Sequence, residues 1–250
     1  MNIKLILLTA VAGYLIGSIS SARLVMKIFG RGKVIPVESE IELEGTDKKL
    51  ILKTISASTV SYHIGAKYGF MTYILDIIKI AIPMLITKQM FPEQSYYLIV
   101  AAAGMVGHVW PIFHRFKGGR GISAVYGGVL VIDWIGVFAT SIPGMLIGLV
   151  VFRDVLTAYL AGVLLVIPWL WFRTHDLNIV LYAVFVNVIF VIAMIPEIKD
   201  WRRIKHEEKW DDPVEVIQLS GMGRGLVKMA RKLGILKKTA SRNADKDTKT

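Results

Sequence analysis

Residues 108–121 read His-Val-Trp-Pro-Ile-Phe-His-Arg-Phe-Lys-Gly-Gly-Arg-Gly, and two apolar runs, Tyr97–Gly107 and Ile122–Ile132, enclose this stretch. Its glycines let the backbone approach a ligand closely. Successive free N–H groups in such a turn, together with the N-terminal dipole of a following helix, can bind an anion. Lys117 and Arg120 add full positive charges, and the arginine fork suits phosphate oxygens. The stretch therefore predicts a phosphate site at a membrane surface.

The same residues also have a purely structural interpretation. Cytoplasmic loops of membrane proteins in general are rich in Lys and Arg, as the positive-inside rule states. Glycines are also common in short turns. The pentapeptide Lys117–Gly121 is compatible with both interpretations, so its apolar setting and the rest of the chain have to separate them.

The composition places the chain among membrane proteins. Of its 250 residues, 54% are hydrophobic, which is too apolar for an ordinary soluble domain. The absence of cysteine excludes disulfides, thiolate catalysis and Cys-ligated metals. The net charge of +11 lies partly beyond residue 197, after an apolar segment. Anionic inner-leaflet lipids are therefore the expected partner of the basic tail, and nucleic acid is not.

Seven apolar segments predict an all-α integral membrane protein with about seven transmembrane helices. A bilayer is crossed by about 17–25 apolar residues, so the fourth segment is short and is a candidate re-entrant helix. The first segment lacks a small-x-small cleavage end, which favours a retained span over a signal peptide. The segments are Ile3–Phe29, Phe70–Met90, Ser95–Phe113, Ile122–Ile132, Ile135–Phe152, Val155–Phe172 and Ile179–Ile195.

Loop charges predict the orientation and the domains. Most Lys and Arg follow the first, third and seventh segments, which puts the N-terminus outside and the C-terminus in the cytoplasm. Residues 1–203 are the expected transmembrane domain, with a cytoplasmic insertion at 30–69. Residues 204–250 are the expected basic tail, and 223–238 has the pattern of an amphipathic helix on the anionic inner leaflet. The insertion and the Lys117 loop would share the cytoplasmic face.

The insertion carries two recognisable patterns. A glutamate occupies every second position from Glu38 to Glu44, and Leu50–Lys53 can form a returning strand. A small hairpin is therefore expected. The acids could hold a divalent cation, although a solvated strand face is the favoured interpretation. Thr54–Tyr68 is rich in hydroxyls and predicts a re-entrant or interfacial helix.

Two features lie inside the apolar segments. Asp76 and Lys79 are spaced to form an i, i+3 pair, and ionisable groups inside a span are costly. A structural pair and a pair facing a site both remain open. Gly13, Gly17 and Ser21 form a stripe of small residues at four-residue spacing, which favours close helix packing over a ligand site.

Taken together, these residues resemble the family of PlsY-type acyl phosphate:glycerol-3-phosphate acyltransferases. The match consists of Gly-Ser-Ile at 17–19, Leu-Asp-Ile-Ile-Lys at 75–79, and Gly-His-Val-Trp-Pro-Ile-Phe at 107–113 running into Phe-Lys-Gly-Gly-Arg-Gly at 116–121. That family transfers a fatty acyl group from acyl phosphate to the primary hydroxyl of glycerol 3-phosphate and makes lysophosphatidic acid. The resemblance implies phospholipid synthesis in the plasma membrane of a prokaryote by a multi-pass protein.

The resemblance also implies roles for individual residues, with no cofactor and no metal. The residues expected to be catalytic are Lys117, Ser58, Thr59 and Asp76. The residues expected to bind the substrate phosphate are Lys117, Gly118, Gly119, Arg120 and Gly121. The residues expected to support the site are His108, Lys79 and Ser18. For His108, a structural hydrogen bond to the glycine loop is favoured over general-base catalysis.

Two further family motifs are altered. In the first, Tyr62 aligns with the family's arginine, and the family's serine falls near Leu52. In the third, residues 196–203 hold neither the histidine nor the asparagine. His175 and Asn178 do spell His-x-x-Asn, but they precede the seventh segment and should face outside, so that match is coincidental. The missing cation could be replaced by one of three basic residues, Arg23, Lys53 or Lys67.

Two functional hypotheses follow. The first is a membrane acyltransferase of this family, since an acyl phosphate has a good leaving group and positioning can supply much of the catalysis. The second is a non-catalytic relative that binds lipid phosphates or regulates a partner enzyme. A small transporter would need an internal repeat, and the chain contains none. The acyltransferase hypothesis requires the Lys117 loop and the Thr54–Tyr62 segment to meet around one cavity.

Overall fold

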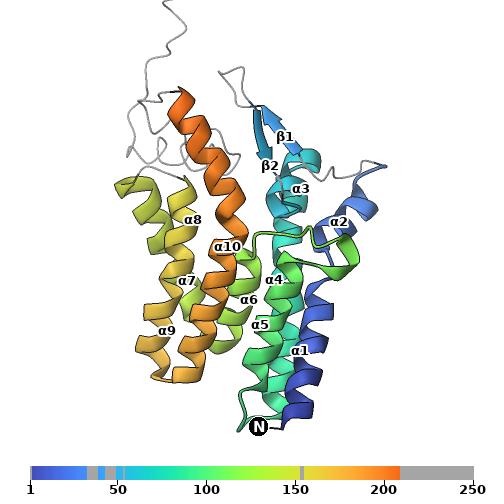
Figure 1. Cartoon of the computed structure of the whole chain (residues 1–250), viewed down its shortest axis with the longest axis vertical. Coiled ribbons are helices and arrows are strands. Elements are labelled where there is room, and N and C mark those ends of the chain that lie inside the picture. Colours follow the sequence, from blue (N-terminus) through green and yellow to red (C-terminus); the bar gives the residue numbers. More distant parts are fainter. Residues whose placement is uncertain (1, 33–38, 43–48, 53, 153–154, 209–250) are drawn as a thin grey trace, which may run out of the picture.

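The computed structural model describes residues 2–32, 39–42, 49–52, 54–152 and 155–208, which form a long helical bundle (Figure 1). The α-helices are α1 (Ile3–Gly17), α2 (Ser21–Phe29), α3 (Ala57–Ile64), α4 (Ala66–Met90), α5 (Tyr96–Val109), α6 (Ile122–Ile132), α7 (Trp134–Leu146), α8 (Val155–Leu164), α9 (Val166–Thr174) and α10 (Leu177–Glu208). The short elements are the 3-10 turn η1 (Ile112–His114), the π-helical turn η2 (Ile147–Val151) and the strands β1 (Ser39–Glu42) and β2 (Lys49–Leu52). Apart from the hairpin, the regular secondary structure of the described residues is helical, and the predicted all-α membrane fold is confirmed. The number of spans and the orientation stay predictions.

Among the described residues, five segments are long and apolar enough to cross a membrane. They are Ile3–Phe29, Ala66–Met90, Tyr96–His114, Thr157–Thr174 and Leu177–Asp200. Two shorter apolar helices, α6 and α7, complete the seven predicted segments. Many large side chains on the outer surface are apolar, among them Leu7, Ile82 and Val188, as expected for a surface that meets lipid.

The helices form two groups joined by α6. In the first group, α1 and α4 pack against α5, and in the second, α7 packs against α8 and α9 against α10. Helix α6 contacts α4, α5 and α7, and α10 also contacts α5. Met105 of α5, Val125 of α6 and Phe190 of α10 are fully buried in the shared core. The core therefore holds both groups in one body.

Small residues bring α1 and α5 close together. A Cβ added to Gly13 would collide with the backbone oxygen of Val100, and one added to Gly17 would collide with that of Gly104. A neighbouring backbone cannot move aside as a flexible side chain can, so these positions require glycine. The predicted close helix packing is confirmed for Gly13 and Gly17, whereas Ser21, the third residue of the predicted stripe, lies beyond the end of α1, in α2.

Two predicted spans are divided, which corrects the expectation of single helices. The first span breaks between Gly17 and Ser21, where the Ser20 hydroxyl accepts the Arg23 N–H at 3.4 Å and caps α2. Serine hydroxyls can satisfy backbone groups at a helix end, so the break costs little. The predicted sixth span, Val155–Phe172, is likewise divided into α8 and α9 near Leu165.

The predicted insertion at 30–69 folds as expected where it is described. Strands β1 and β2 pair antiparallel, with Ser39 opposite Leu52, so the predicted hairpin is confirmed. The hydroxyl-rich segment forms the short helix α3. The hairpin, α2 and α3 lie at one end of the bundle, and the N-terminus and the α9–α10 turn lie at the other (Figure 1). Residues 209–250, which hold most of the basic tail and its expected helix at 223–238, lie outside the described residues, as do residues 33–38, 43–48 and Lys53.

Candidate functional site

The chain reverses direction between α5 and α6 and forms the glycine loop, residues 117–121. After Pro111 the turn η1 is followed by Arg115 and Phe116, both with left-handed backbone, at φ of 52° and 59°. The Phe116 N–H donates to the Pro111 carbonyl at 3.0 Å and closes the turn. The loop is thereby folded back against the end of α5.

Hydrogen bonds tie the glycine loop to three other parts of the chain. The Gly119 N–H donates to the carbonyl of His108 on α5 at 3.1 Å, and the Ile55 N–H donates to the Gly118 carbonyl at 3.0 Å. Both terminal nitrogens of Arg23 on α2 donate to the Lys117 carbonyl at 3.2 Å. The loop and the segment before α3 therefore meet, as the acyltransferase hypothesis requires.

The loop glycines serve different purposes. Only Gly121 has a positive φ, 97°, at the N-cap of α6. Gly119 is required because its backbone lies against the imidazole of His108, so that an added Cβ would collide with Nε2. The sequence predicted close backbone approach to a ligand, whereas the neighbour that Gly119 approaches is a buried histidine of the same chain, so the approach to a ligand stays a prediction.

Asp76, Lys79 and His108 converge beside the loop. The Lys79 ammonium lies 2.9 Å from Oδ1 of Asp76, and Nδ1 of His108 lies 3.5 Å from the same oxygen. Lys79 also donates to the carbonyl of Ile19 at 2.9 Å, in the break between α1 and α2. All three ionisable side chains are largely buried. The i, i+3 pair predicted from the sequence forms, and it faces a pocket.

That pocket opens where α1 gives way to α2. Its lining combines backbone from the break, the three converging side chains and two loop glycines. The lining residues are Gly17, Ser18, Ile19, Ser20, Ser21, Ala22, Ile55, Asp76, Lys79, His108, Pro111, Gly118 and Gly119. Lys79 is the one lysine or arginine among these lining residues. An anion entering the pocket would therefore meet a single ammonium beside a carboxylate.

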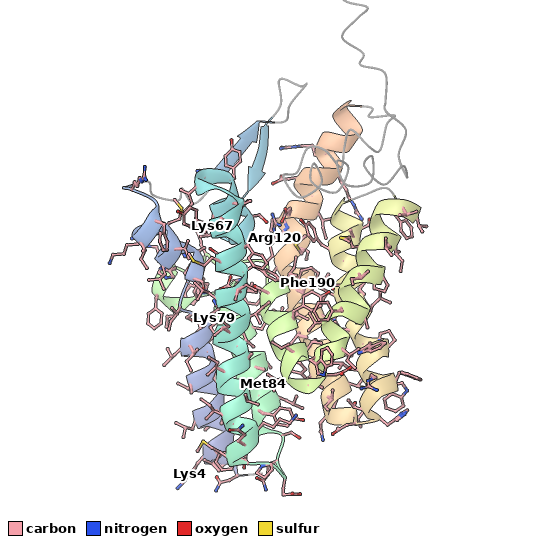
Figure 2. The ribbon with its side chains drawn as sticks, turned by 180° about the vertical axis from the view of Figure 1, so that it is seen from behind. Lys4, Lys67, Lys79, Met84, Arg120 and Phe190 are labelled. Atoms are coloured by element: carbon pink, nitrogen blue, oxygen red, sulfur yellow. The ribbon has the colours of Figure 1, made fainter. Side chains whose placement is uncertain are left out.

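Arg120 points to the opposite side of the loop. Its Nη2 lies 2.7 Å from Oε1 of Glu197 on α10, and its Nη1 donates to the Ser58 hydroxyl at 3.5 Å. Figure 2 shows Arg120 between α4 and α10, nearer the hairpin end than Lys79. The loop thus has two faces: Gly118 and Gly119 line the pocket, and Arg120 faces α3 and α10.

The remaining predicted residues are spread around these two faces. Lys117 is exposed and is not among the residues that line the pocket. The Ser18 hydroxyl donates to the Tyr14 carbonyl at 2.8 Å, and the buried Thr59 hydroxyl donates to the Thr54 carbonyl at 2.7 Å. Both hydroxyls therefore donate to backbone close to them in the chain.

The sequence matches a known family over most of its length. A model of the glycerol-3-phosphate acyltransferase family matches residues 7–206. The chain belongs to this family. A relative from Methylococcus capsulatus, named glycerol-3-phosphate acyltransferase, is 31% identical over 197 residues, which cover 78% of this chain and 90% of the relative. Relatives of the same name from Legionella pneumophila are 32% identical over 123 residues, and the chain spans only 40% of their length.

Two solved structures share the fold of this family member. The crystal structure of PlsY in its glycerol 3-phosphate form has a TM-score of 0.65 at 22% identity and covers 78% of this chain and 90% of PlsY. The lysophosphatidic acid form of PlsY has a TM-score of 0.62 at 21% identity and covers 85% and 98%. PlsY is described as an integral membrane protein, and with its apolar helices this family member is a multi-pass membrane protein.

Sequence reasoning missed Glu197 as a site residue and left Arg23 as one of three replacement cations. Arg23 contacts the loop, whereas Lys67 is exposed on α4. A carboxylate directly after the last apolar segment was the available signal for Glu197. The turn that carries His175 and Asn178 lies at the opposite end of the bundle from α3 (Figure 1). This placement agrees with the interpretation that the His-x-x-Asn match is a coincidence.

Proposed function

We propose that this family member transfers a fatty acyl group from acyl phosphate to glycerol 3-phosphate and so makes lysophosphatidic acid for phospholipid synthesis. Its place would be the plasma membrane of a prokaryote, with the glycine loop at the inner leaflet. The observation that carries the proposal is the junction of the loop with α2, α5 and the segment before α3, beside a pocket that contains Lys79. Family membership over residues 7–206 supports it.

The proposed reaction involves two phosphate groups, one held on each face of the glycine loop. The primary hydroxyl oxygen of glycerol 3-phosphate attacks the acyl carbon, the bond from that carbon to the phosphate oxygen breaks, and inorganic phosphate leaves with the electron pair. The hydroxyl proton passes to the leaving phosphate or to water. Lys117 and Arg120 are the proposed cations for the acceptor phosphate, with Ser58 beside Arg120. Lys79, on the other face of the loop, can stabilise the second phosphate.

Asp76 and His108 are better suited to positioning than to proton transfer. Nδ1 of His108 faces Asp76 at 3.5 Å, and Nε2 lies against the backbone of Gly119. A general base needs a free nitrogen within reach of the substrate hydroxyl. Asp76 places its Oδ1 next to both Lys79 and His108. We therefore assign both residues to holding Lys79 and the loop in place.

Purified protein supplied with acyl phosphate and glycerol 3-phosphate is expected to release lysophosphatidic acid and inorganic phosphate. Lys117→Ala should raise the KM for glycerol 3-phosphate about tenfold with little change in kcat, because an exposed cation on the glycine loop contributes binding in ground and transition states alike. Lys27→Ala, which removes an exposed lysine from α2, is the control and should leave the KM unchanged.

The outcomes separate the two functional hypotheses. No product from folded protein that still binds glycerol 3-phosphate would end the enzyme assignment and establish the binding role. Product formation with an unchanged KM in Lys117→Ala would keep the activity and remove Lys117 from the phosphate site.

The proposed orientation can be measured because the chain contains no cysteine. A single cysteine at Lys117 should react with a membrane-impermeant maleimide only from the cytoplasmic side. A single cysteine at Asn178, near the start of α10, should react only from the outside, because the α9–α10 turn lies at the other end of the bundle. Labelling of both positions from the same side would contradict the proposed topology. If Lys117 is labelled from the cytoplasmic side and Asn178 from the outside, the basic tail, residues 204–250, is expected on the cytoplasmic leaflet.

A further inference from the structure

Arg120 and Glu197 form a buried ion pair between the glycine loop and α10. Nη2 of Arg120 lies 2.7 Å from Oε1 of Glu197, and the two side chains are 9% and 18% exposed. Glu197 belongs to the stretch 196–203, which replaces the third motif of the family. The pair is therefore a feature of this chain where it departs from the family pattern.

The ion pair is incomplete. Within the described residues, Nε of Arg120 and Oε2 of Glu197 are both buried and have no hydrogen-bond partner. Arginine and carboxylate commonly form two parallel bonds, and a buried donor left without an acceptor is costly. A contact that served only to join the loop to α10 would be expected to use both bonds. The unused Nε–H is therefore a donor available to a ligand with more than one oxygen.

A phosphate group is such a ligand. Its oxygens can accept from Nε and Nη2 of Arg120 together, whereas Glu197 engages Nη2 through one oxygen. Carboxylate and phosphate would then approach the same nitrogen, and the repulsion between their like charges opposes full binding of both at once. The Ser58 hydroxyl, 3.5 Å from Nη1, lies on the same side of the loop.

We propose that Glu197 is a positioning residue that competes with the substrate phosphate for Arg120. In the substrate-free protein it holds the guanidinium, and a phosphomonoester must displace it to bind. This inference rests on the proposed phosphate-binding role of Arg120. Because the carboxylate stays nearby after the exchange, its negative charge opposes any anion at Arg120, and Glu197 therefore sets the affinity of the loop.

The test is a binding titration on the full chain in detergent micelles, with glycerol 3-phosphate and with inorganic phosphate. Glu197→Gln keeps the shape of the side chain and an oxygen for Nη2, but removes the competing charge. The expected result is an approximately tenfold lower Kd for both ligands. Asp200→Asn removes the same charge from α10 three residues further on and should change the Kd by less than about twofold.

Further variants show whether the gain acts through Arg120. The double variant Arg120→Gln with Glu197→Gln should lose the gain in affinity, because no guanidinium is left to release. Glu197→Asp keeps the charge on a shorter side chain and should also lower the Kd for both ligands. It serves as the second variant if Glu197→Gln does not fold.

An unchanged or weaker affinity in both folded Glu197 variants would overturn the proposal and make Glu197 a structural partner of Arg120. An equal gain in Asp200→Asn would overturn it as well, since net charge would then be the cause. These readouts do not depend on turnover. If Glu197→Gln binds more tightly while no variant forms product, the competition stands and the acyltransferase assignment fails. If product forms but the Kd of Glu197→Gln does not change, the acyltransferase assignment stands and the proposed competition fails.

Discussion

Gly119→Ala is expected to reduce acyl transfer about 100-fold or more, because a misplacement of about 1 Å at reacting groups costs that much. The added Cβ would collide with Nε2 of His108 and lie 2.9 Å from its Cε1. The imidazole is buried and has Asp76 on its other side, so it has no room to turn away. The loop must shift instead, and Gly118, which lines the pocket, would move with it.

The measurement for this variant is the initial rate at saturating glycerol 3-phosphate and acyl phosphate, on protein shown to be folded by its thermal transition. Gly104→Ala is the matched control: its Cβ would meet Cδ1 of Ile80 at 2.8 Å, the end of a flexible side chain. That side chain can change rotamer, so activity should stay within about threefold of wild type. If Gly119→Ala reacts at the wild-type rate, the glycine loop does not position the reacting groups.

The sequence was a good guide to those parts of the fold that the membrane dictates. Apolar segments and basic loops follow from the cost of polar groups in lipid, so the helical fold class was predictable. The stripe at Gly13 and Gly17 was predictable too, since small residues at four-residue spacing fall on one helix face. The break after Gly17 was not predictable from hydropathy, because serine is tolerated within a helix and the run to Phe29 stays apolar.

Several predicted site residues do lie together, but their arrangement was not predictable. Gly118, Gly119, Asp76, Lys79 and His108 line one pocket. The separation of Lys79 and Arg120 onto two faces of the loop depends on how α10 packs, and no local pattern encodes it. Glu197 meets Arg120 only through the tertiary fold. A sequence-based argument could note each charge but could not assign its partner.

Asp76→Ala is expected to be the most destabilising single change in the site, at about 3 kcal/mol or more. It removes the carboxylate that lies 2.9 Å from the Lys79 ammonium, and the Lys79 side chain is 11% exposed. An uncompensated charge in a largely buried place is costlier than the loss of the whole pair. The measurement is the thermal transition of the detergent-solubilised protein. Asp133→Asn, which changes a carboxylate at the start of α7, is measured beside it for comparison.

The double variant Asp76→Ala with Lys79→Met tells a structural pair from a pair that serves the site. Removing both charges should restore most of the lost stability, because the methionine stem fills the space of the lysine without an unpaired charge. Acyl transfer should nevertheless stay about 100-fold below wild type, since Lys79 is the one lysine or arginine that lines the pocket. If activity returns together with stability, the pair is structural and Lys79 does not act on a phosphate. If Asp76→Ala alone is as stable as wild type, the ammonium is compensated by the Ile19 carbonyl, and Asp76 is not needed to hold it.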